Sequence, residues 1–151
     1  MTLALRVLAI PGVGLPLLRR IDARAARRVE RSLFYDRAFV TPERIDFAVR
    51  VAARPENARI YLETARSLGT FRGVRKPWRA ALLAEVARLP LPMLIVWGDR
   101  DRILPPAHLA AAHAALPGAQ IHMFPDTGHL PQIERADDFA DLARPFVTAH
   151  S

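Results

Sequence analysis

The chain contains no cysteine, a single lysine and only three serines among its 151 residues. The absence of cysteine excludes disulfides and thiolate metal ligands, and it is compatible with the cytoplasmic location that we expect. Because Lys76 is the only lysine, the net charge of +7 comes almost entirely from arginine. The serines are Ser32, Ser67 and Ser151, so a serine nucleophile has few candidates.

The positive charge is spread over several expected helices instead of forming one binding motif. Aromatic residues make up only 7% of the chain, so we expect solvated helix faces and no nucleic-acid partner. The apolar stretch Leu3–Leu18 is interrupted by Arg6, Pro11 and Gly14, and positive charge follows it. A signal peptide needs charge before the apolar run, and a membrane span needs about 20 nearly uninterrupted residues. We therefore expect no membrane partner and assign the stretch to cap or hinge structure.

Two short apolar runs in the second half predict buried strands that end in polar turns. The first run, Met93–Gly98, is followed by Asp99 and Asp101, and the second precedes His129. The Ala-rich segment Pro106–Leu116 between them predicts a helix. Such a crossover makes the two strands parallel, so both turns open at the carboxyl edge of the sheet. An acid and a histidine therefore meet there, as in a nucleophile, histidine and acid triad.

These motifs resemble the C-terminal part of a cap-bearing α/β-hydrolase, a branch with C–C bond hydrolases, esterases, epoxide hydrolases and haloalkane dehalogenases. The family's acid follows a pattern like W-G-x-x-D-x-x-x-P, matched here by Trp97, Gly98, Asp101 and Pro105. Its histidine lies in a G-H-x-x-x-x-E turn, matched by Gly128, His129 and Glu134. The resemblance implies a partial α/β-hydrolase fold, in which a helical cap is followed by the last two parallel strands and flanking helices.

The resemblance selects Asp101 and His129 as catalytic residues. Asp99 and Asp126 are expected to be turn residues, a role for which aspartate is common. For Glu134, bracing the histidine turn and a purely structural role both remain open. The other histidines lack a second ligand at a metal spacing, so we expect no metal and no cofactor; they are His108, His113, His122 and His150.

The first half predicts three helices without strands, as expected for a lid. The helix expected over Leu17–Tyr35 has an apolar stripe formed by Ile21, Ala25, Val29 and Leu33. Thr41 and Pro42 predict the N-cap and first turn of a second helix, and a third is expected from about Pro55 to Gly69. We expect residues 1–75 to form the cap or lid region and residues 76–151 the C-terminal part of the core. The lid aromatics are expected to be buried core residues more than substrate contacts; they are Phe34, Tyr35, Phe39, Phe47, Tyr61 and Phe71.

The family's G-x-S-x-G nucleophile elbow has no counterpart in the sequence. Ala65–Gly69 imitates its spacing, but the preceding residues have a helical rhythm, so we expect Ser67 on a helix that ends at Gly69. The early strands of the sheet are also absent. We therefore expect an N-terminally truncated hydrolase chain that lacks its nucleophile and is inactive alone.

The expected activity of the complete enzyme is hydrolysis of an ester, C–C or related bond in a small-molecule substrate. Leu130 stands where some C–C hydrolases carry tryptophan, which weakens the case for that subclass without removing it. The alternative is a noncatalytic fragment or binding module that docks on a partner through its exposed sheet edge. The expected partner is a missing N-terminal half or a second copy of the chain.

Overall fold

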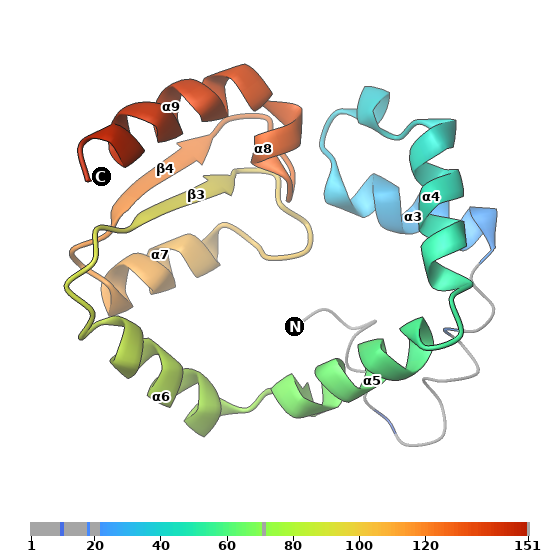
Figure 1. Ribbon diagram of the computed structural model, residues 1–151, viewed down its shortest axis with the longest axis horizontal. Helices are drawn as coiled ribbons and strands as arrows, with labels where there is room; N and C mark the ends of the chain where they lie inside the picture. Colours follow the sequence, from blue (N-terminus) through green and yellow to red (C-terminus); the bar gives the residue numbers. More distant parts are fainter. Residues whose placement is uncertain (1–9, 11–17, 19–21, 71, 151) are drawn as a thin grey trace. The chain divides into compact units, whose positions relative to one another are not determined.

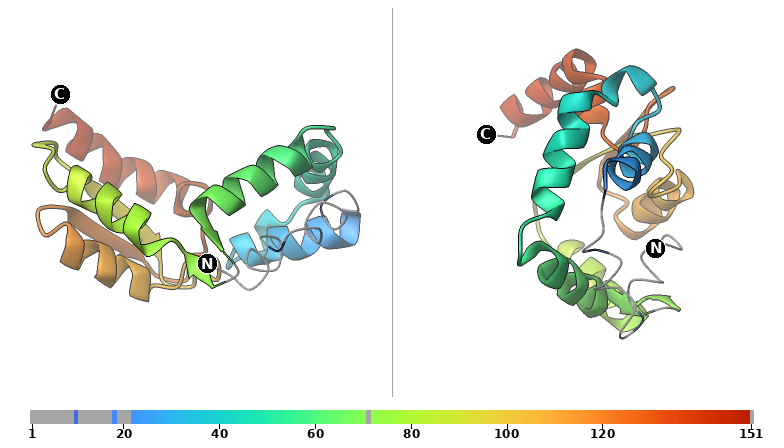
Figure 2. Two further views of the ribbon diagram at one scale, coloured as in Figure 1. Left: turned by 90° about the horizontal axis from the view of Figure 1, so that it is seen from below. Right: turned by 90° about the vertical axis from the view of Figure 1, so that its right-hand side faces the viewer.

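The computed structural model describes residues 10, 18, 22–70 and 72–150. The chain forms two compact units, of which the first comprises Met1–Glu30 and Val40–Leu82. The second comprises Arg31–Phe39 and Leu83–Ser151. We call them the helical unit and the sheet unit; Figures 1 and 2 show their elements coloured along the chain. The apolar stretch assigned to cap or hinge lies almost wholly outside the described residues.

Three helices account for most of the helical unit. They are α3 (Ala23–Leu33), which runs on into the sheet unit, α4 (Pro42–Ala52) and α5 (Asn57–Leu68). Their buried apolar residues are Ala26, Ile45, Ala58, Leu62 and Ala65. As predicted, α4 begins after an N-cap at Thr41, whose hydroxyl accepts a hydrogen bond from the amide of Arg44 at 3.3 Å.

The apolar stripe predicted for the first helix is wrong in its register. The helix ends at Leu33 instead of Tyr35, and Val29 of the stripe is 55% exposed. The buried positions are Ala26 and Glu30. Glu30 can be buried because its carboxylate accepts a hydrogen bond from Arg44 Nε at 2.8 Å, which pairs its charge.

A short hairpin follows α5 that the sequence did not predict. Its strands β1 (Gly69–Thr70) and β2 (Gly73–Val74) are antiparallel. Strands of two residues are too short to show the alternation from which a strand is recognised. Gly73 has a φ of 117°, which only glycine adopts readily, so this residue makes the return possible.

The sheet unit contains the predicted parallel pair, β3 (Leu94–Gly98) and β4 (Gln120–Phe124), in a register from Leu94↔Gln120 to Gly98↔Phe124. The crossover between the strands is α7 (Ala107–Ala115), again as predicted. The chain closes with α8 (Pro131–Glu134) and α9 (Ala136–Thr148). Helices α7 and α9 lie on opposite faces of the sheet (Figure 1), so the unit is a three-layer α/β arrangement.

The buried apolar residues of the sheet unit come from several elements: Phe34, Leu109, Leu116, Ala119 and Phe124. Two further elements are η1 (Arg37–Phe39) and α6 (Lys76–Val86), which begins in the helical unit and leads toward β3. Within the residues that the structure describes, no helix is both long and apolar enough to cross a membrane.

Candidate active site

The two loops at the carboxyl ends of β3 and β4 carry the predicted acid and histidine. Beyond the last register pair of the strands, the amide of Asp99 donates to the carbonyl of Phe124 at 3.0 Å. The amide of Arg100 donates to the carbonyl of Thr127 at 2.9 Å. These bonds continue the strand pairing into the loops, so the loops stay side by side where they leave the sheet.

Asp101 is a buried carboxylate with hydrogen bonds on both oxygens; its side chain is only 4% exposed. Oδ1 accepts from the backbone amides of Ile103 at 2.7 Å and Leu104 at 2.8 Å. Oδ2 lies 2.8 Å from Nδ1 of His129. The indole of Trp97 donates to the carbonyl of Leu104 at 2.9 Å and so ties the turn back to β3.

His129 meets Asp101 through Nδ1 and keeps 28% of its side-chain surface exposed. The predicted meeting of these two side chains at the strand ends is therefore confirmed. When Nδ1–H donates to the carboxylate, the neutral ring carries its lone pair on Nε2, which is the atom that a general base uses. A small cavity of about 100 Å³ borders both side chains.

Gly98 allows the two loops to approach this closely. A Cβ atom at this position would lie 2.1 Å from the carbonyl oxygen of Gly128 and 2.2 Å from that of Thr127. Both are backbone atoms that cannot move without moving the loop that carries His129. The glycine of the acid motif is therefore required by contact with the histidine loop.

Glu134 joins the histidine turn to the segment that follows α3. One carboxylate oxygen accepts from the amides of Tyr35 and Asp36, both at 2.8 Å, and the other accepts from the amide of Gly128. The amide of His129 itself donates to the carbonyl of Leu33 at 2.7 Å. Sequence reasoning missed the segment 33–36, because Glu134 and Tyr35 are 99 positions apart and no local pattern reports such a contact.

The two competing acids are turn residues, as expected. Asp99 Oδ1 accepts from the amide of Thr127 at 3.3 Å. Asp126 has a φ of 47°, a left-handed conformation that aspartate tolerates better than most residues. Arg100 forms ion pairs with both acids, at 3.5 Å to Asp99 and 3.3 Å to Asp126.

The remaining histidines lie elsewhere. His108 and His113 are exposed on α7, and His122 packs edge-on against Phe124 with ring centroids 4.3 Å apart. His150 Nδ1 lies 2.7 Å from a backbone carbonyl near the end of the chain. In the described part of the chain, no three His, Asp or Glu side chains come together in a way that could hold a metal ion.

Ser67 lies on α5, so the helical interpretation of its motif is confirmed. Its hydroxyl donates to the carbonyl of Thr64 at 2.8 Å, a bond within the helix. Gly69 is the C-cap residue of α5, as predicted, although its backbone is extended.

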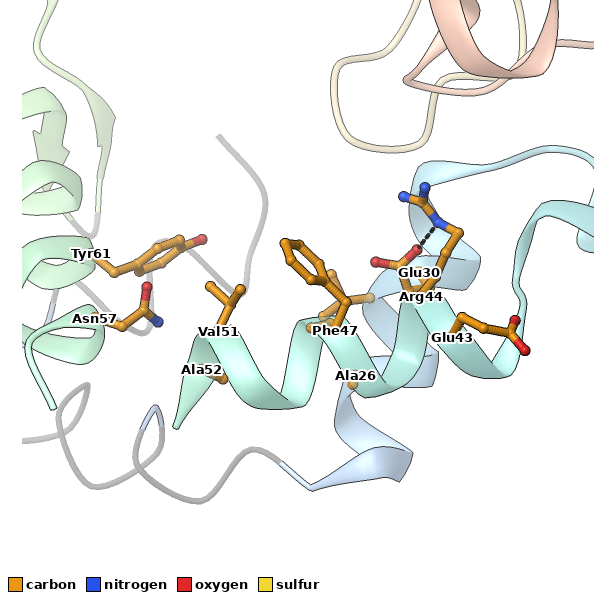
Figure 3. Close-up of a pocket in the computed structure, with 11 residues that line it drawn as sticks. Ala26, Glu30, Glu43, Arg44, Phe47, Val51, Ala52, Asn57 and Tyr61 are labelled. Carbon is orange, nitrogen blue, oxygen red and sulfur yellow. Dashed lines mark hydrogen bonds and ion pairs between the residues drawn. The ribbon is translucent and has the colours of Figure 1, made fainter. Parts of the chain in front are cut away.

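The helical unit holds a cavity of about 600 Å³ with a mainly apolar lining from α3, α4 and α5. The Glu30–Arg44 ion pair lies at one end and Asn57 with Tyr61 at the other (Figure 3). Phe47 lines the cavity and is 61% exposed, so the expectation that it is a buried lid residue is wrong, and the same holds for Tyr61 at 44%. The burial that remains raises the pKa of the Tyr61 phenol above its ordinary value.

Phe34 behaves as expected for a core aromatic. It is 1% exposed and stacks on Phe39 with ring centroids 5.7 Å apart. Both residues belong to the sheet unit, and Phe34 lies within the segment 33–36 that contacts the histidine turn. Tyr35 is 41% exposed, contrary to expectation, and Phe71 lies outside the described residues.

Known proteins are similar to this chain over part of their own length. Over 121 residues the chain is 35% identical to the dihydrolipoyllysine-residue acetyltransferase component of the acetoin cleaving system of Cupriavidus necator, covering 80% of this chain and 30% of that protein. It is 26% identical over 144 residues to the 2-hydroxy-6-oxononadienedioate/2-hydroxy-6-oxononatrienedioate hydrolase of Comamonas testosteroni, covering 92% and 48%. The chain therefore spans half or less of the length of these relatives.

Solved structures share the fold. A meta-cleavage product hydrolase of Pseudomonas fluorescens superposes with a TM-score of 0.69 at 21% identity, covering 86% of this chain and 47% of that one. The sequence profile of the alpha/beta hydrolase family matches residues 2–142, which is nearly the whole chain. The chain belongs to the alpha/beta hydrolase family.

Proposed function

We propose that this chain supplies the acid and the histidine of an α/β-hydrolase that cleaves an ester, C–C or related bond. The observation that carries the proposal is the 2.8 Å contact between Asp101 Oδ2 and His129 Nδ1 at the carboxyl ends of two parallel strands. In this family the histidine takes a proton from the nucleophile and later moves it to the leaving group or activates water. His129 would act through Nε2, while Asp101 orients the ring and stabilises its charged form.

The turn around Asp101 supports this division of roles. Amides of Ile103 and Leu104 hold Oδ1, so the carboxylate cannot rotate and Oδ2 stays directed at the imidazole. Burial lowers the local dielectric and strengthens the contact with the positive ring that forms during proton transfer.

The nucleophile, in this proposal, comes from polypeptide outside the 151 residues. The sequence has no cysteine and no nucleophile elbow, and the hydroxyl of Ser67 is engaged within α5. An imidazole oriented by an acid then has only unpositioned water to activate. We therefore expect the chain by itself to show no hydrolase turnover.

The substrate is proposed to be a small molecule with an apolar group. The support is the small cavity that borders Asp101 and His129, whose lining includes Val96 and Leu104. Apolar cavities with a few polar groups at their ends suit ligands of mixed character. The relative from Comamonas testosteroni is named as a hydrolase of 2-hydroxy-6-oxo dienedioates, which makes related carbonyl compounds reasonable first substrates.

The test compares the chain alone with a longer product. The first sample is the purified 151-residue chain, assayed with a p-nitrophenyl ester. The second is the product of the reading frame extended upstream to a G-x-S-x-G or G-x-D-x-G codon string. We expect turnover only in the extended protein, and we expect Asp101→Asn to lower its kcat by about 10³- to 10⁴-fold.

Three outcomes would contradict the proposal. Steady turnover by the chain alone that is lost in Ser67→Ala would make Ser67 the nucleophile. An upstream sequence without any elbow would favour the noncatalytic binding module. Turnover of the extended protein that survives both Asp101→Asn and His129→Ala would also reject the assigned roles.

A further inference from the structure

We propose that Glu134 is a positioning residue for His129, an inference that rests on the proposed function of the Asp101–His129 pair. Glu134 does not touch His129 through its side chain in any hydrogen bond. Instead its carboxylate accepts from the amide of Gly128, just before His129, and from two amides of the segment that follows α3.

Three backbone amides donate to Glu134. Those of Tyr35 and Asp36 reach Oε1 at 2.8 Å, and that of Gly128 reaches Oε2. Charge-assisted hydrogen bonds of this kind are about twice as strong as neutral ones. Gly128 is the residue directly before His129, so the carboxylate holds the Thr127–Gly128 peptide, one peptide before the residue that carries the imidazole.

A second contact holds the next peptide, between Gly128 and His129. The amide of His129 donates to the carbonyl of Leu33 at 2.7 Å. Gly128 has no room for a side chain: a Cβ would lie 2.5 Å from the Leu33 carbonyl oxygen and 2.8 Å from Glu134 Oε2. The backbone around His129 is therefore held by Leu33 and by Glu134. Leu33 is the last residue of α3, and Glu134 also binds the amides of the two residues Tyr35 and Asp36 that follow shortly after it.

This arrangement matters for the imidazole because its partner is immobile. Asp101 Oδ1 is fixed by two amides, so Oδ2 cannot follow a histidine that shifts. Small displacements of the His129 backbone would then lengthen the 2.8 Å contact between Asp101 Oδ2 and His129 Nδ1. The Nδ1–H tautomer of the ring would lose the stabilisation that this contact gives it. Glu134 thus determines, through the backbone, which nitrogen of His129 carries the proton.

The test reads the tautomer of His129 directly. Protein labelled with 15N at histidine is examined by NMR at alkaline pH, where imidazole is neutral and the shifts of Nδ1 and Nε2 distinguish the tautomers. Soluble protein is measured in solution, and associated protein is sedimented and measured under magic-angle spinning. Wild-type chain should show the Nδ1–H form at His129.

Glu134→Gln is the informative substitution. Glutamine keeps the size of the side chain but replaces one acceptor oxygen with an NH₂ group, which cannot accept from an amide. Either Gly128 or the pair Tyr35 and Asp36 then loses its acceptor. We expect the Nδ1–H population of His129 to fall by at least about two-fold as the Nε2–H form appears. Glu134→Asp, which keeps the charge but is one methylene shorter, should act in the same direction and serves if the glutamine variant does not fold.

Leu109→Ala is the structural control. Leu109 is 2% exposed on α7, so its truncation weakens the sheet unit. It does not change the hydrogen bonds that Glu134 and Leu33 make around His129, which we call the clamp. We expect the His129 spectrum of this variant to match wild type. A purely structural Glu134 would behave in the same way as Leu109.

The spectra test the Asp101–His129 pair and the positioning role of Glu134 separately. Wild-type protein with the Nε2–H form at His129 would reject the Asp101–His129 pair and the proposed function with it. If wild type has the Nδ1–H form and Asp101→Asn reverses it, the pair stands. Unchanged spectra in the folded Glu134 variants would then overturn the positioning role alone.

Discussion

At the scale of single residues, the site depends on how closely two backbone loops approach each other. Gly98 ends β3 against the carbonyls of Thr127 and Gly128. The hydrogen bonds of Asp101 and His129 begin only three and one residues beyond these contacts. The spacing of the backbone and the geometry of the pair are therefore set by the same few atoms.

Substituting Gly98 tests this directly. A methyl group would meet backbone oxygens at 2.1 and 2.2 Å, so Gly98→Ala should destabilise the chain by about 3 kcal/mol through enforced backbone shifts. Gly118→Ala is the matched control, because nothing lies within 4 Å of its Cβ position. We expect the control to change stability by no more than about 0.5 kcal/mol, measured by urea denaturation. Equal stability of the two variants would contradict the close approach of the loops.

The two central residues of the candidate site could be predicted from the sequence. Asp101 and His129 could be predicted because each follows a short apolar run that is recognisable as a strand, and parallel strands end at one edge. The three amides on Glu134 could not be predicted, since two of them belong to a segment nearly one hundred positions away. The indole bond from Trp97 was missed for a different reason: the motif shows that tryptophan is present but not which carbonyl it reaches.

At the scale of the elements, helix signals were reliable at termini and weak along faces. Thr41 and Pro42 predicted the start of α4 because capping is decided by adjacent residues. The stripe on α3 was wrong because Glu30 is buried with its charge paired by Arg44, a contact made by another helix. A prediction from apolar periodicity places every carboxylate on the exposed face of a helix. It therefore assigned the wrong face of α3 to the core.

The N-terminus of α4 makes a pH-dependent contribution to stability. A hydrogen bond from its own backbone amide, and then one from the Thr41 side chain, holds the pKa of the exposed Glu43 below its ordinary value of 4.5. A lowered folded-state pKa means that this stabilisation is complete above pH 4.5 and is lost as pH falls through the folded value. Wild type should therefore exceed Glu43→Gln in stability at neutral pH, and the difference should vanish in acid.

Thermal unfolding across this pH range is the measurement. Glu56→Gln provides the control, because Glu56 also stands at a helix N-terminus but makes no side-chain capping bond. A wild-type advantage over Glu43→Gln that persists unchanged in strong acid would show that the charge of Glu43 is not its source.

At the scale of the whole molecule, the described sheet has only two strands, and part of its apolar surface is open. Ile121 and Met123 alternate along β4, so they share one face, and each is 44% exposed. Apolar side chains next to an unpaired strand edge favour association between chains. We expect the purified chain to self-associate at micromolar concentration.

Replacing both side chains should reverse this association. The double variant Ile121→Thr with Met123→Thr keeps β propensity but removes apolar area, so its sedimentation coefficient should fall toward that of a monomer. Val147→Thr is the control, since Val147 is 61% exposed and belongs to α9 instead of to a strand. A wild-type chain that sediments as a sharp monomer would contradict the prediction and favour a self-sufficient binding module.

The contact between Glu134 and Tyr35 also bears on the order in which the molecule folds. It joins residues 99 positions apart, whereas the Asp101–His129 contact joins residues 28 apart. Closing the longer loop costs about 1 kcal/mol more chain entropy, and that loop encloses the Val40–Leu82 part of the helical unit. The strand, helix and strand around the acid and the histidine can thus collapse early, while the clamp on the histidine peptide must wait until the intervening helices have shortened the path. We therefore expect the final alignment of the imidazole to be a late event in folding.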